Sequence, residues 1–333
     1  MRKFQKLLQK ARIYSDIHSI TSLCASGNNR TYRISTASET FLAKEYFHQN
    51  FDGRDRLSTE FSFLKYANHI APDWVPKAYA FDLENNLGLF EFIYGETVKP
   101  SEVVDKFVLK AAQFFATLNS VHGRNSADLP IASEACFSIN DHLSLISDRL
   151  ANLLEIKSNS LVNIEAIELV KKITMKWQGI KDIICRNALD FGLDTSEVLP
   201  MEYRCVSPSD FGFHNALLQG EVLKFIDFEY AGWDDPAKMV GDFFSQIAVP
   251  VSEKYIDEFI SKSFSCYEDP DSLIYRSRLL RPAYQIKWCC IALNIFIPVN
   301  FERRKFANPG LDEALIKQVQ ITKAAEVLQK IGG

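Results

Sequence analysis

The stretch Ser207-Pro-Ser-Asp-Phe-Gly-Phe-His-Asn-Ala-Leu217, followed by Phe225-Ile-Asp-Phe-Glu-Tyr230, decides the fold of this chain. Asp210 and Asn215 stand five residues apart in a predicted tight loop, and Asp227 follows Asn215 by twelve residues, across a predicted hairpin. Phosphoryl transfer requires a carboxylate that orients the attacking hydroxyl, and oxygen ligands that hold Mg²⁺ against the phosphates of ATP. Asp210 suits the first role, and Asn215 and Asp227 suit the second.

This spacing is a weak signal when it stands alone. About one D-x-x-x-x-N match is expected by chance in a chain of this length, and an Asx-turn loop between a helix and a strand would account for it. A catalytic loop and a simple Asx-turn loop make different demands on the rest of the sequence. Only a phosphoryl-transfer site also needs residues that bind the nucleotide.

The hydrophobic pattern changes along the chain from strand-like to helix-like. Short strands are predicted at Thr31–Ser35, Phe41–Phe47 and Leu87–Phe92, with a helix at Asp55–His69 before the last of them. After residue 101, helices are predicted at 103–121, 140–154, 161–184, 237–248, 252–265, 272–293 and 312–331. One hairpin, Ala216–Phe228, interrupts them. A small β-rich lobe therefore precedes a larger helical lobe, and a cleft between two such lobes is a common place for a ligand.

The run from Ser209 to Phe244 (SDFGFHNAL, FIDFEYAGWDDP, GDFF) resembles the aminoglycoside phosphotransferase and choline kinase family of small-molecule kinases. The resemblance spans about residues 20–250. It implies an α+β, two-lobed protein-kinase-like fold, with a small β-rich N-terminal lobe and a larger, mainly helical C-terminal lobe. Residues 1–94 would form the nucleotide-binding lobe, and residues 95–333 the helical lobe with the catalytic loop and the acceptor site.

The resemblance also implies roles for residues of the first lobe. A nucleotide-covering loop would contain Ser26, Gly27, Asn28 and Asn29. Lys44 would contact the α- and β-phosphates of ATP, with Glu60 fixing its direction. The backbone of Glu91 and Ile93 would meet adenine at the hinge between the lobes. Each feature alone has an ordinary interpretation, such as a hairpin turn or a solvated charge, and the ordered set is what favours a nucleotide site.

Two positions near the catalytic loop are notable. The family usually has His where this chain has Pro208, which makes the role of Asp210 less secure. His214 precedes the expected metal ligand Asn215, so we expect its side chain to face away and not to act as a base. By resemblance, Asp242 would brace the catalytic loop.

A peptide acceptor is disfavoured because no long activation segment fits between Asp227 and the helix predicted to begin at Ala237. A sugar or an amino alcohol is the favoured acceptor, with choline or ethanolamine and an aminoglycoside as alternatives. An aromatic cage for a quaternary ammonium would draw on Trp233, Tyr284, Trp288 and Phe296, although core packing is the favoured explanation for these residues. The segment from Asp271 to Gly310 holds seven basic and two acidic residues, which would suit a neutral or anionic acceptor.

The sequence thus predicts an O-phosphotransferase that uses ATP and Mg²⁺ and acts on a small molecule bearing a hydroxyl group. A nucleotide-binding regulatory module without turnover is the alternative of another class, supported by Pro208 and the glycine-poor loop.

The composition of the chain limits which other classes of protein it could belong to. The net charge is −4, from 38 basic and 42 acidic residues, which excludes a general polyanion binder. Seven cysteines, without metal-binding spacing, favour free thiols in a reducing compartment. The longest apolar run, Trp288–Val299, is too short to span a bilayer, and residues 1–12 do not read as a secretion signal. We therefore expect a cytoplasmic protein, and nothing implies a nucleic-acid, membrane or protein partner.

Overall fold

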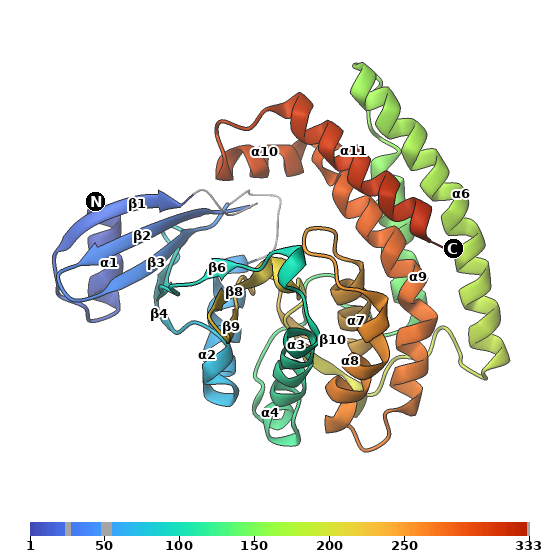
Figure 1. Cartoon of the computed structure of the whole chain (residues 1–333), viewed down its shortest axis with the longest axis horizontal. Coiled ribbons are helices and arrows are strands. Elements are labelled where there is room, and N and C mark those ends of the chain that lie inside the picture. Colours follow the sequence, from blue (N-terminus) through green and yellow to red (C-terminus); the bar gives the residue numbers. More distant parts are fainter. Residues whose placement is uncertain (24–27, 48–54, 332–333) are drawn as a thin grey trace.

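The computed structural model describes residues 1–23, 28–47 and 55–331. Ser26 and Gly27, expected in the nucleotide-covering loop, lie outside these residues. Two lobes are visible in Figure 1, a β-sheet lobe that begins at the N-terminus and a larger lobe built mainly from helices. The fold expected from the sequence is therefore the one observed.

The small lobe contains a five-stranded antiparallel sheet in the order β1-β2-β3-β5-β4. Its strands are β1 (Ile17–Leu23), β2 (Arg30–Thr36), β3 (Thr40–Glu45), β4 (Ala78–Asp82) and β5 (Leu87–Glu91). Helix α1 (Arg2–Lys10) contacts β4 and β5 and buries Phe4, Leu7 and Leu8 against the sheet. The three strands expected here are confirmed as β2, β3 and β5, whereas β1 and β4 were not individually predicted.

Helix α2 (Arg56–Ile70) follows β3 in the chain and contacts β4 and β5. It begins at the N-cap Asp55, whose carboxylate accepts a hydrogen bond of 2.9 Å from the backbone N–H of Ser58. Such a cap satisfies one of the N–H groups that a helix leaves unpaired at its start. The helix buries Phe63 and Leu64 and carries the buried acid Glu60.

The large lobe consists of helices around one hydrophobic cluster that joins α3 to α8 and a second that joins α5, α6, α9 and α11. Its α-helices are α3 (Asp105–Leu118), α4 (Val121–Ser126), α5 (Ile139–Leu153), α6 (Leu161–Asp190), α7 (Pro236–Ser245), α8 (Ile256–Ser263), α9 (Asp271–Leu293), α10 (Pro298–Ala307) and α11 (Glu313–Lys330). The 3-10 turns are η1 (Pro72–Trp74), η2 (Pro100–Glu102), η3 (Met201–Tyr203), η4 (Phe213–Asn215), η5 (Glu253–Tyr255), η6 (Phe264–Cys266) and η7 (Asn294–Phe296). None of the described helices is long and apolar enough to cross a membrane.

Two small sheets frame the loop predicted to be catalytic. Strands β6 (Glu96–Thr97), β8 (Ala216–Gln219) and β9 (Val222–Phe225) form one sheet, in which β8 and β9 are the expected hairpin. Gly220 has a φ of +60° at its turn, a conformation that favours glycine. Strands β7 (Cys205–Ser207) and β10 (Gly232–Asp234) form the other. The loop from residue 208 to residue 215 therefore leaves one sheet and enters the other.

Among the differences from the predicted helices, one boundary and one missed helix have clear local reasons. The helix expected over 103–121 ends at Leu118, and the Ser120 side chain caps a new helix by accepting from the N–H of Gly123 at 3.1 Å. Helix α10 was not predicted because Pro298 reads as an interruption. Proline suits the first position of a helix, where its missing N–H has no partner to lose, and α10 begins there.

Candidate active site

Lys44, which belongs to strand β3 of the small lobe, lies at the centre of a cluster of acidic side chains. Its Nζ is 2.6 Å from Oε2 of Glu60 and also contacts Oδ1 of Asp227. Burial opposes protonation of this lysine, but the carboxylates of Asp227, Glu60 and Glu229 outweigh it and raise the pKa of Lys44. The structure thus places a fixed cation between the sheet and the segment expected to hold the metal.

Glu60 is fixed from three sides. Besides the contact with Lys44, its Oε2 accepts from the hydroxyl of Tyr46, and its Oε1 accepts from the N–H of Phe228 at 3.3 Å. Phe228 directly follows Asp227, so helix α2 is tied through one carboxylate to both β3 and the expected metal-binding segment. This arrangement fixes the direction of the Lys44 side chain.

The pKa of the Asp227 carboxyl is raised above its ordinary value, and burial is the largest cause. Burial, then Glu229 and Glu60, raise the pKa of the Asp227 carboxyl, against the opposing effect of Lys44. Its φ is +67°, a conformation that costs a non-glycine residue free energy and is concentrated at functional sites. A cation placed here would stabilise the charged form of this carboxylate.

Glu229 is a site residue that the sequence analysis missed. It is 3% exposed, and its carboxylate accepts from Nδ2 of Asn29 at 2.7 Å and from Nδ2 of Asn28 at 3.3 Å. Both asparagines belong to the loop expected to cover the nucleotide. The available signal was the position of Glu229, an acid two residues after the expected metal ligand Asp227.

The strand before the catalytic loop is held by a buried asparagine. Asn119, which is fully buried, donates from Nδ2 to the carbonyl of Val206 at 3.0 Å and accepts from its N–H at 2.7 Å. Three residues after Val206, the N–H of Ser209 donates to the Ser207 hydroxyl at 3.0 Å, and Ser209 adopts a φ of +65°. A rigid, locally strained turn therefore presents Asp210.

Both oxygens of Asp210 are engaged. Oδ1 lies 3.0 Å from Nε2 of His214, and Oδ2 lies 3.3 Å from Nδ2 of Asn215, which also donates to the Asp210 carbonyl at 2.9 Å. Burial would raise the pKa of Asp210, but the charge and hydrogen bond of His214, with Lys287 and Asn215, outweigh it and lower the pKa. The Asp210 side chain is 36% exposed, so an acceptor hydroxyl can reach it.

The expectation that His214 faces away is wrong. The short turn η4 places His214 four residues after Asp210, with its ring directed at that carboxylate. Gly212 permits this close approach, because a Cβ at that position would lie 2.7 Å from Nδ1 of His214. Burial lowers the pKa of His214, but Asp210, Asp227 and Asp242 raise it above the ordinary value. His214 therefore contacts Asp210 and lies within electrostatic range of Asp227, so the catalytic loop and the segment expected to bind the metal are neighbours.

Asp242 does not bond the catalytic loop as the resemblance implied. Within the described residues its carboxylate accepts from Nζ of Lys287 at 2.9 and 2.8 Å and from Nε1 of Trp288 at 2.9 Å. The ring of Trp288 meets that of His214 edge-on, with centroids 6.1 Å apart. Asp242 therefore acts on the site through Trp288 and Lys287 and through its own charge, which raises the pKa of His214.

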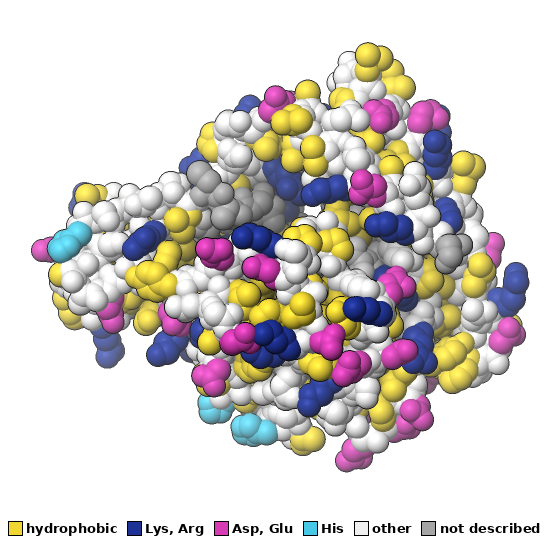
Figure 2. All heavy atoms as spheres, in the orientation of Figure 1, with side chains coloured by type: hydrophobic (Ala, Val, Ile, Leu, Met, Phe, Trp, Pro, Cys, Tyr) yellow, Lys and Arg dark blue, Asp and Glu magenta, His cyan; other side chains and the backbone are white. Residues whose placement is uncertain are grey.

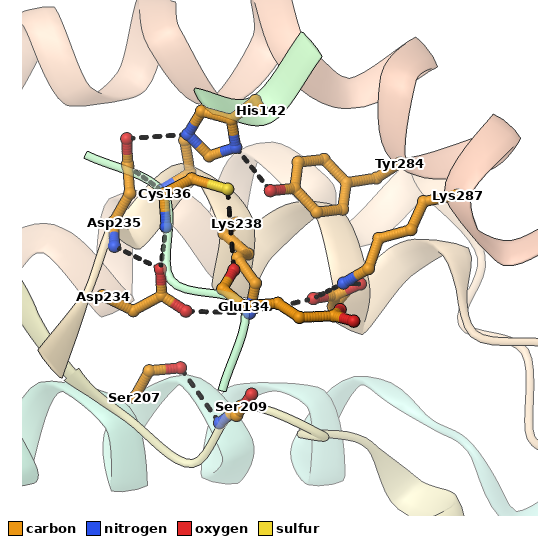
Figure 3. A network of polar contacts seen from close by, with 12 residues as sticks. Glu134, Cys136, His142, Ser207, Ser209, Asp234, Asp235, Lys238, Tyr284 and Lys287 are labelled. Atoms are coloured by element: carbon orange, nitrogen blue, oxygen red, sulfur yellow. Dashed lines mark hydrogen bonds and ion pairs between the residues drawn. The ribbon is translucent and has the colours of Figure 1, made fainter. Parts of the chain in front are cut away.

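A buried polar network lies behind the loop (Figure 3). Lys238 donates to Asp234 at 2.8 Å, and Asp234 accepts from the N–H of Cys136 at 3.1 Å. Glu134 points toward Lys287, and burial is outweighed by Arg149, Lys287 and Lys238, which lower its pKa to about 2. Each buried charge here has a partner of opposite sign, as burial of ions requires.

The aromatic residues considered for an ammonium cage do not form one. Tyr284 is completely buried and contacts His142, and Nζ of Lys287 lies 5.2 Å from the centre of its ring. Nζ of Lys317 lies 5.2 Å from the centre of the Phe296 ring. The chain's own lysines therefore occupy the positions that a quaternary ammonium would take on these two rings.

Ion pairs also neutralise much of the positive charge between Asp271 and Gly310. Four of the seven basic residues there pair with carboxylates of the same lobe; the pairs are Arg276–Asp235, Arg278–Asp257, Arg281–Glu253 and Lys287–Asp242. The remaining three, Arg303, Arg304 and Lys305, lie on α10. The excess of basic residues in this segment of the sequence is therefore not enough to indicate the charge of the acceptor.

Glu91 and Ile93 lie where the chain leaves the small lobe. Glu91 ends β5, and its N–H donates to the carbonyl of Lys77 at 2.8 Å. Ile93 follows in an extended segment that leads to β6 of the large lobe and is half-buried. Both are therefore positioned at the connection between the lobes.

The oxygen ligands suit a magnesium ion that is shared with a nucleotide. Within residues 1–23, 28–47 and 55–331, no group of three or more His, Cys, Asp or Glu could hold a metal by itself. Mg²⁺ is typically bound through one or two carboxylates together with substrate phosphates. Asn215 directs its amide nitrogen at Asp210, which turns its oxygen the other way, and the pKa of the Asp227 carboxyl is raised, which a bound cation would offset. These donors fit the metal.

Solved small-molecule kinases share this fold, although no protein-family model and no curated protein matches the sequence. A choline/ethanolamine kinase family protein from Mesorhizobium loti is 15% identical with a TM-score of 0.62, over 99% of this chain and 94% of that chain. A choline kinase from Cryptosporidium parvum is 16% identical with a TM-score of 0.56, over 94% and 90%. An ADP-bound aminoglycoside phosphotransferase is 15% identical with a TM-score of 0.56, over 98% and 95%. The chain has the two-lobed, protein-kinase-like fold of these enzymes.

Proposed function

We propose that this protein is an ATP- and Mg²⁺-dependent O-phosphotransferase that phosphorylates a hydroxyl group of a small molecule. The observation that carries the proposal is the convergence of Lys44, Asp210, Asn215 and Asp227 on one site from three separate segments. The neighbouring folds support it, since one was solved with ADP and spectinomycin and another with AMP-PNP and Ca²⁺.

In this proposal Asp210 orients the acceptor hydroxyl and accepts its proton as the hydroxyl oxygen attacks the γ-phosphorus. The bond from that phosphorus to the bridging oxygen breaks, and ADP leaves with the electron pair. Lys44 binds the α- and β-phosphates in the direction that Glu60 fixes. Mg²⁺, held by Asn215 and Asp227, would neutralise charge on the phosphate oxygens.

A sugar or another neutral polyol is the favoured acceptor, ahead of an amino alcohol. The charge of Lys287 lowers the pKa of Asp210 despite the ion pair of that lysine with Asp242, and a cationic acceptor at Asp210 would meet the same charge. The positions of Lys287 and Lys317 over the aromatic rings also argue against choline. Aminoglycosides, which carry several positive charges, are disfavoured for the same electrostatic reason.

The test is Mg²⁺-dependent release of ADP from ATP in the presence of monosaccharides, sugar phosphates, ethanolamine, choline and kanamycin. Asp210→Asn should abolish any stimulation while still binding Mg·ATP, because the carboxylate acts on the acceptor. Asp148→Asn, an exposed aspartate on α5, is the matched control and should leave the rate unchanged. Binding of Mg·ATP without turnover on any acceptor would favour a regulatory module, and failure of the wild type to bind Mg·ATP would overturn the proposal.

A further inference from the structure

An arginine of the small-lobe sheet packs on the aromatic residues that connect the two lobes. Arg33, in the middle of β2, is exposed, and its guanidinium lies 5.1 Å from the centre of the Phe92 ring and 5.9 Å from that of Tyr94. The two rings meet edge-on, with centroids 5.0 Å apart. Both belong to the segment that leads from β5 to β6, on either side of Ile93. The guanidinium is therefore held at the connection between the lobes.

Arg33 projects from the face of the sheet that also carries Lys44. Successive side chains of a strand point to opposite faces. The neighbours of Arg33 along β2, Tyr32 and Ile34, belong to the hydrophobic cluster that α1 covers. Ala43, the neighbour of Lys44 on β3, belongs to the same cluster. Arg33 and Lys44 therefore share the opposite face, which is turned toward the candidate site.

The register of the strands places Arg33 beside the path that a nucleotide would take from Lys44. Arg33 pairs with Leu42, two residues before Lys44 on β3, which is a separation of about 7 Å along an extended strand. In the other direction along the same face, Tyr46 is buried and its hydroxyl contacts Glu60. A nucleotide whose phosphates bind Lys44 therefore extends past Leu42, toward Arg33 and the connection.

This direction leads toward the surface between the lobes. The connection from β5 to β6 passes from one lobe to the other (Figure 1), and Figure 2 shows the surface hollowed between these lobes. Tyr94 is 56% exposed in the connection, and Arg33 is exposed as well. A flat cation and an aromatic ring are therefore accessible to the part of a nucleotide that lies farthest from its phosphates.

A guanidinium group in this position suits a nucleobase. It is planar and weakly hydrated, and it stacks on aromatic faces, including those of bases. Phe92 and Tyr94 already restrain the guanidinium, so less conformational freedom is lost when a ligand binds to it. The position of Arg33 and the chemistry of its side chain thus point to the same part of the ligand.

We propose that Arg33, supported by Phe92 and Tyr94, stacks on the face of the nucleobase of the phosphate donor. Arg33 contributes affinity for the base, whereas Lys44 contributes affinity for the phosphates. The inference rests on the proposed function for the presence of a nucleoside triphosphate. It goes further because it assigns a binding residue to the base, and its test measures binding and needs no turnover.

The experiment compares the dissociation constants of Mg·ATP and magnesium tripolyphosphate for wild type and Arg33→Ala. Arg33→Ala should weaken Mg·ATP about five- to tenfold, the size expected of one cation–π contact. Tripolyphosphate has no base, so its affinity, measured by competition with Mg·ATP, should change by less than about twofold. An equal loss for both ligands would place Arg33 on the phosphates and overturn the proposal.

Two further variants separate stacking from charge. Arg33→Trp keeps a flat face that stacks on a base but removes the charge, and it should bind Mg·ATP within about twofold of the wild type. Arg33→Lys keeps the charge as a strongly hydrated point and loses the plane, so it should bind about as weakly as Arg33→Ala. Recovery of affinity by lysine and not by tryptophan would mean that Arg33 acts by its charge alone, and it would refute stacking.

Arg2→Ala is the matched control, since Arg2 is an exposed cation on α1, which covers the opposite face of the same sheet. It should change the affinity for Mg·ATP by less than about twofold at physiological salt, where exposed charges are screened. Glu60→Gln should instead weaken Mg·ATP and tripolyphosphate alike, because it acts through Lys44.

The failure of this proposal is distinguishable from the failure of the proposed function. If Arg33→Ala binds Mg·ATP as tightly as the wild type does, Arg33 only supports the connection between the lobes and the proposal is overturned. If the wild type itself does not bind Mg·ATP, the proposed function is refuted.

Discussion

Nε2 of His214 lies 3.0 Å from Oδ1 of Asp210, so an imidazole holds the carboxylate that is proposed to accept the acceptor's proton. Asn215 lies against the other oxygen at 3.3 Å, and the two contacts together fix the rotation of the carboxylate. The edge of Trp288 limits the movement of the His214 ring in turn. Orientation of a reacting group of this kind contributes to the rate without contributing to nucleotide affinity.

His214→Ala should therefore lower kcat about 10- to 100-fold, as the loss of a supporting hydrogen bond does at comparable sites, while the KM for ATP changes little. His214→Gln, whose amide nitrogen can donate in place of Nε2, should recover part of that loss. Steady-state kinetics with a saturating acceptor separate the two parameters. Equal kcat values for wild type and His214→Ala would show that Asn215 alone orients the carboxylate.

Glu60→Gln should weaken the binding of Mg·ATP about tenfold. The change removes the charge that fixes the Lys44 ammonium at 2.6 Å but keeps the shape of the side chain, and charge-assisted hydrogen bonds of this kind are the strong ones. Titration calorimetry gives the affinity. Glu39→Gln, an exposed acid of the same lobe, is the control and should bind as the wild type does. An unchanged affinity in Glu60→Gln would mean that Asp227 positions Lys44 without help.

The sequence predicted most of the fold, because the relevant signals are local. The hydrophobic period identified α2, α5 and α9, and the Gln219-Gly220 turn identified the hairpin of β8 and β9. Helix α10 was not predicted because Pro298 looks like an interruption of an apolar run. In the structure the same proline is the first residue of the helix, a position that the sequence pattern alone does not reveal. The end of α3 depends on Asn119, whose partner Val206 lies 87 residues away.

The candidate site was predictable where it follows a spacing, and not where it depends on tertiary contacts. Asp210, Asn215 and Asp227 could be proposed from their order in the sequence. The direction of His214 depends on the short turn η4 and on Gly212, which the sequence alone does not settle. The basic residues between Asp271 and Gly310 were a misleading guide to the acceptor for the same reason. Lys287, for example, pairs with Asp242, which lies on a different helix.

Gly241→Ala should destabilise the protein by about 1–3 kcal/mol, the usual range for overpacking a filled core. A Cβ at Gly241 would lie 2.4 Å from ring atoms of Tyr284, which is completely buried between α7 and α9. Urea unfolding measures the free energy. Gly179→Ala is the contrasting control: nothing lies within 4 Å of its added Cβ, and it should stabilise α6 by up to about 1 kcal/mol. Stability equal to that of the wild type in Gly241→Ala would show that Tyr284 can move.

The pH dependence of stability should report the buried His142, which lies behind the site (Figure 3). Its Nε2 is 3.0 Å from Oδ2 of Asp235, and its Nδ1 contacts the hydroxyl of Tyr284. Burial lowers the pKa of His142, and Asp235 only partly offsets the effect. Arg276 and His142 hold the pKa of Asp235 well below its ordinary value despite burial, so this aspartate does not titrate between pH 5 and 7.

As the pH falls below the ordinary histidine pKa of about 6.5, the unfolded chain therefore takes up a proton at residue 142 before the folded protein does. The free energy of unfolding should fall as the pH decreases from 7 to 5, with up to about 1.4 kcal/mol per pH unit from this one group. His142→Gln should lower stability at pH 7, because it disturbs two buried hydrogen bonds, and should also reduce the slope by about one proton. His122→Gln, an exposed histidine on α4, provides the control for the slope. Urea unfolding at three pH values measures both quantities, and parallel pH profiles for wild type and His142→Gln would mean that His142 accepts its proton in the folded state.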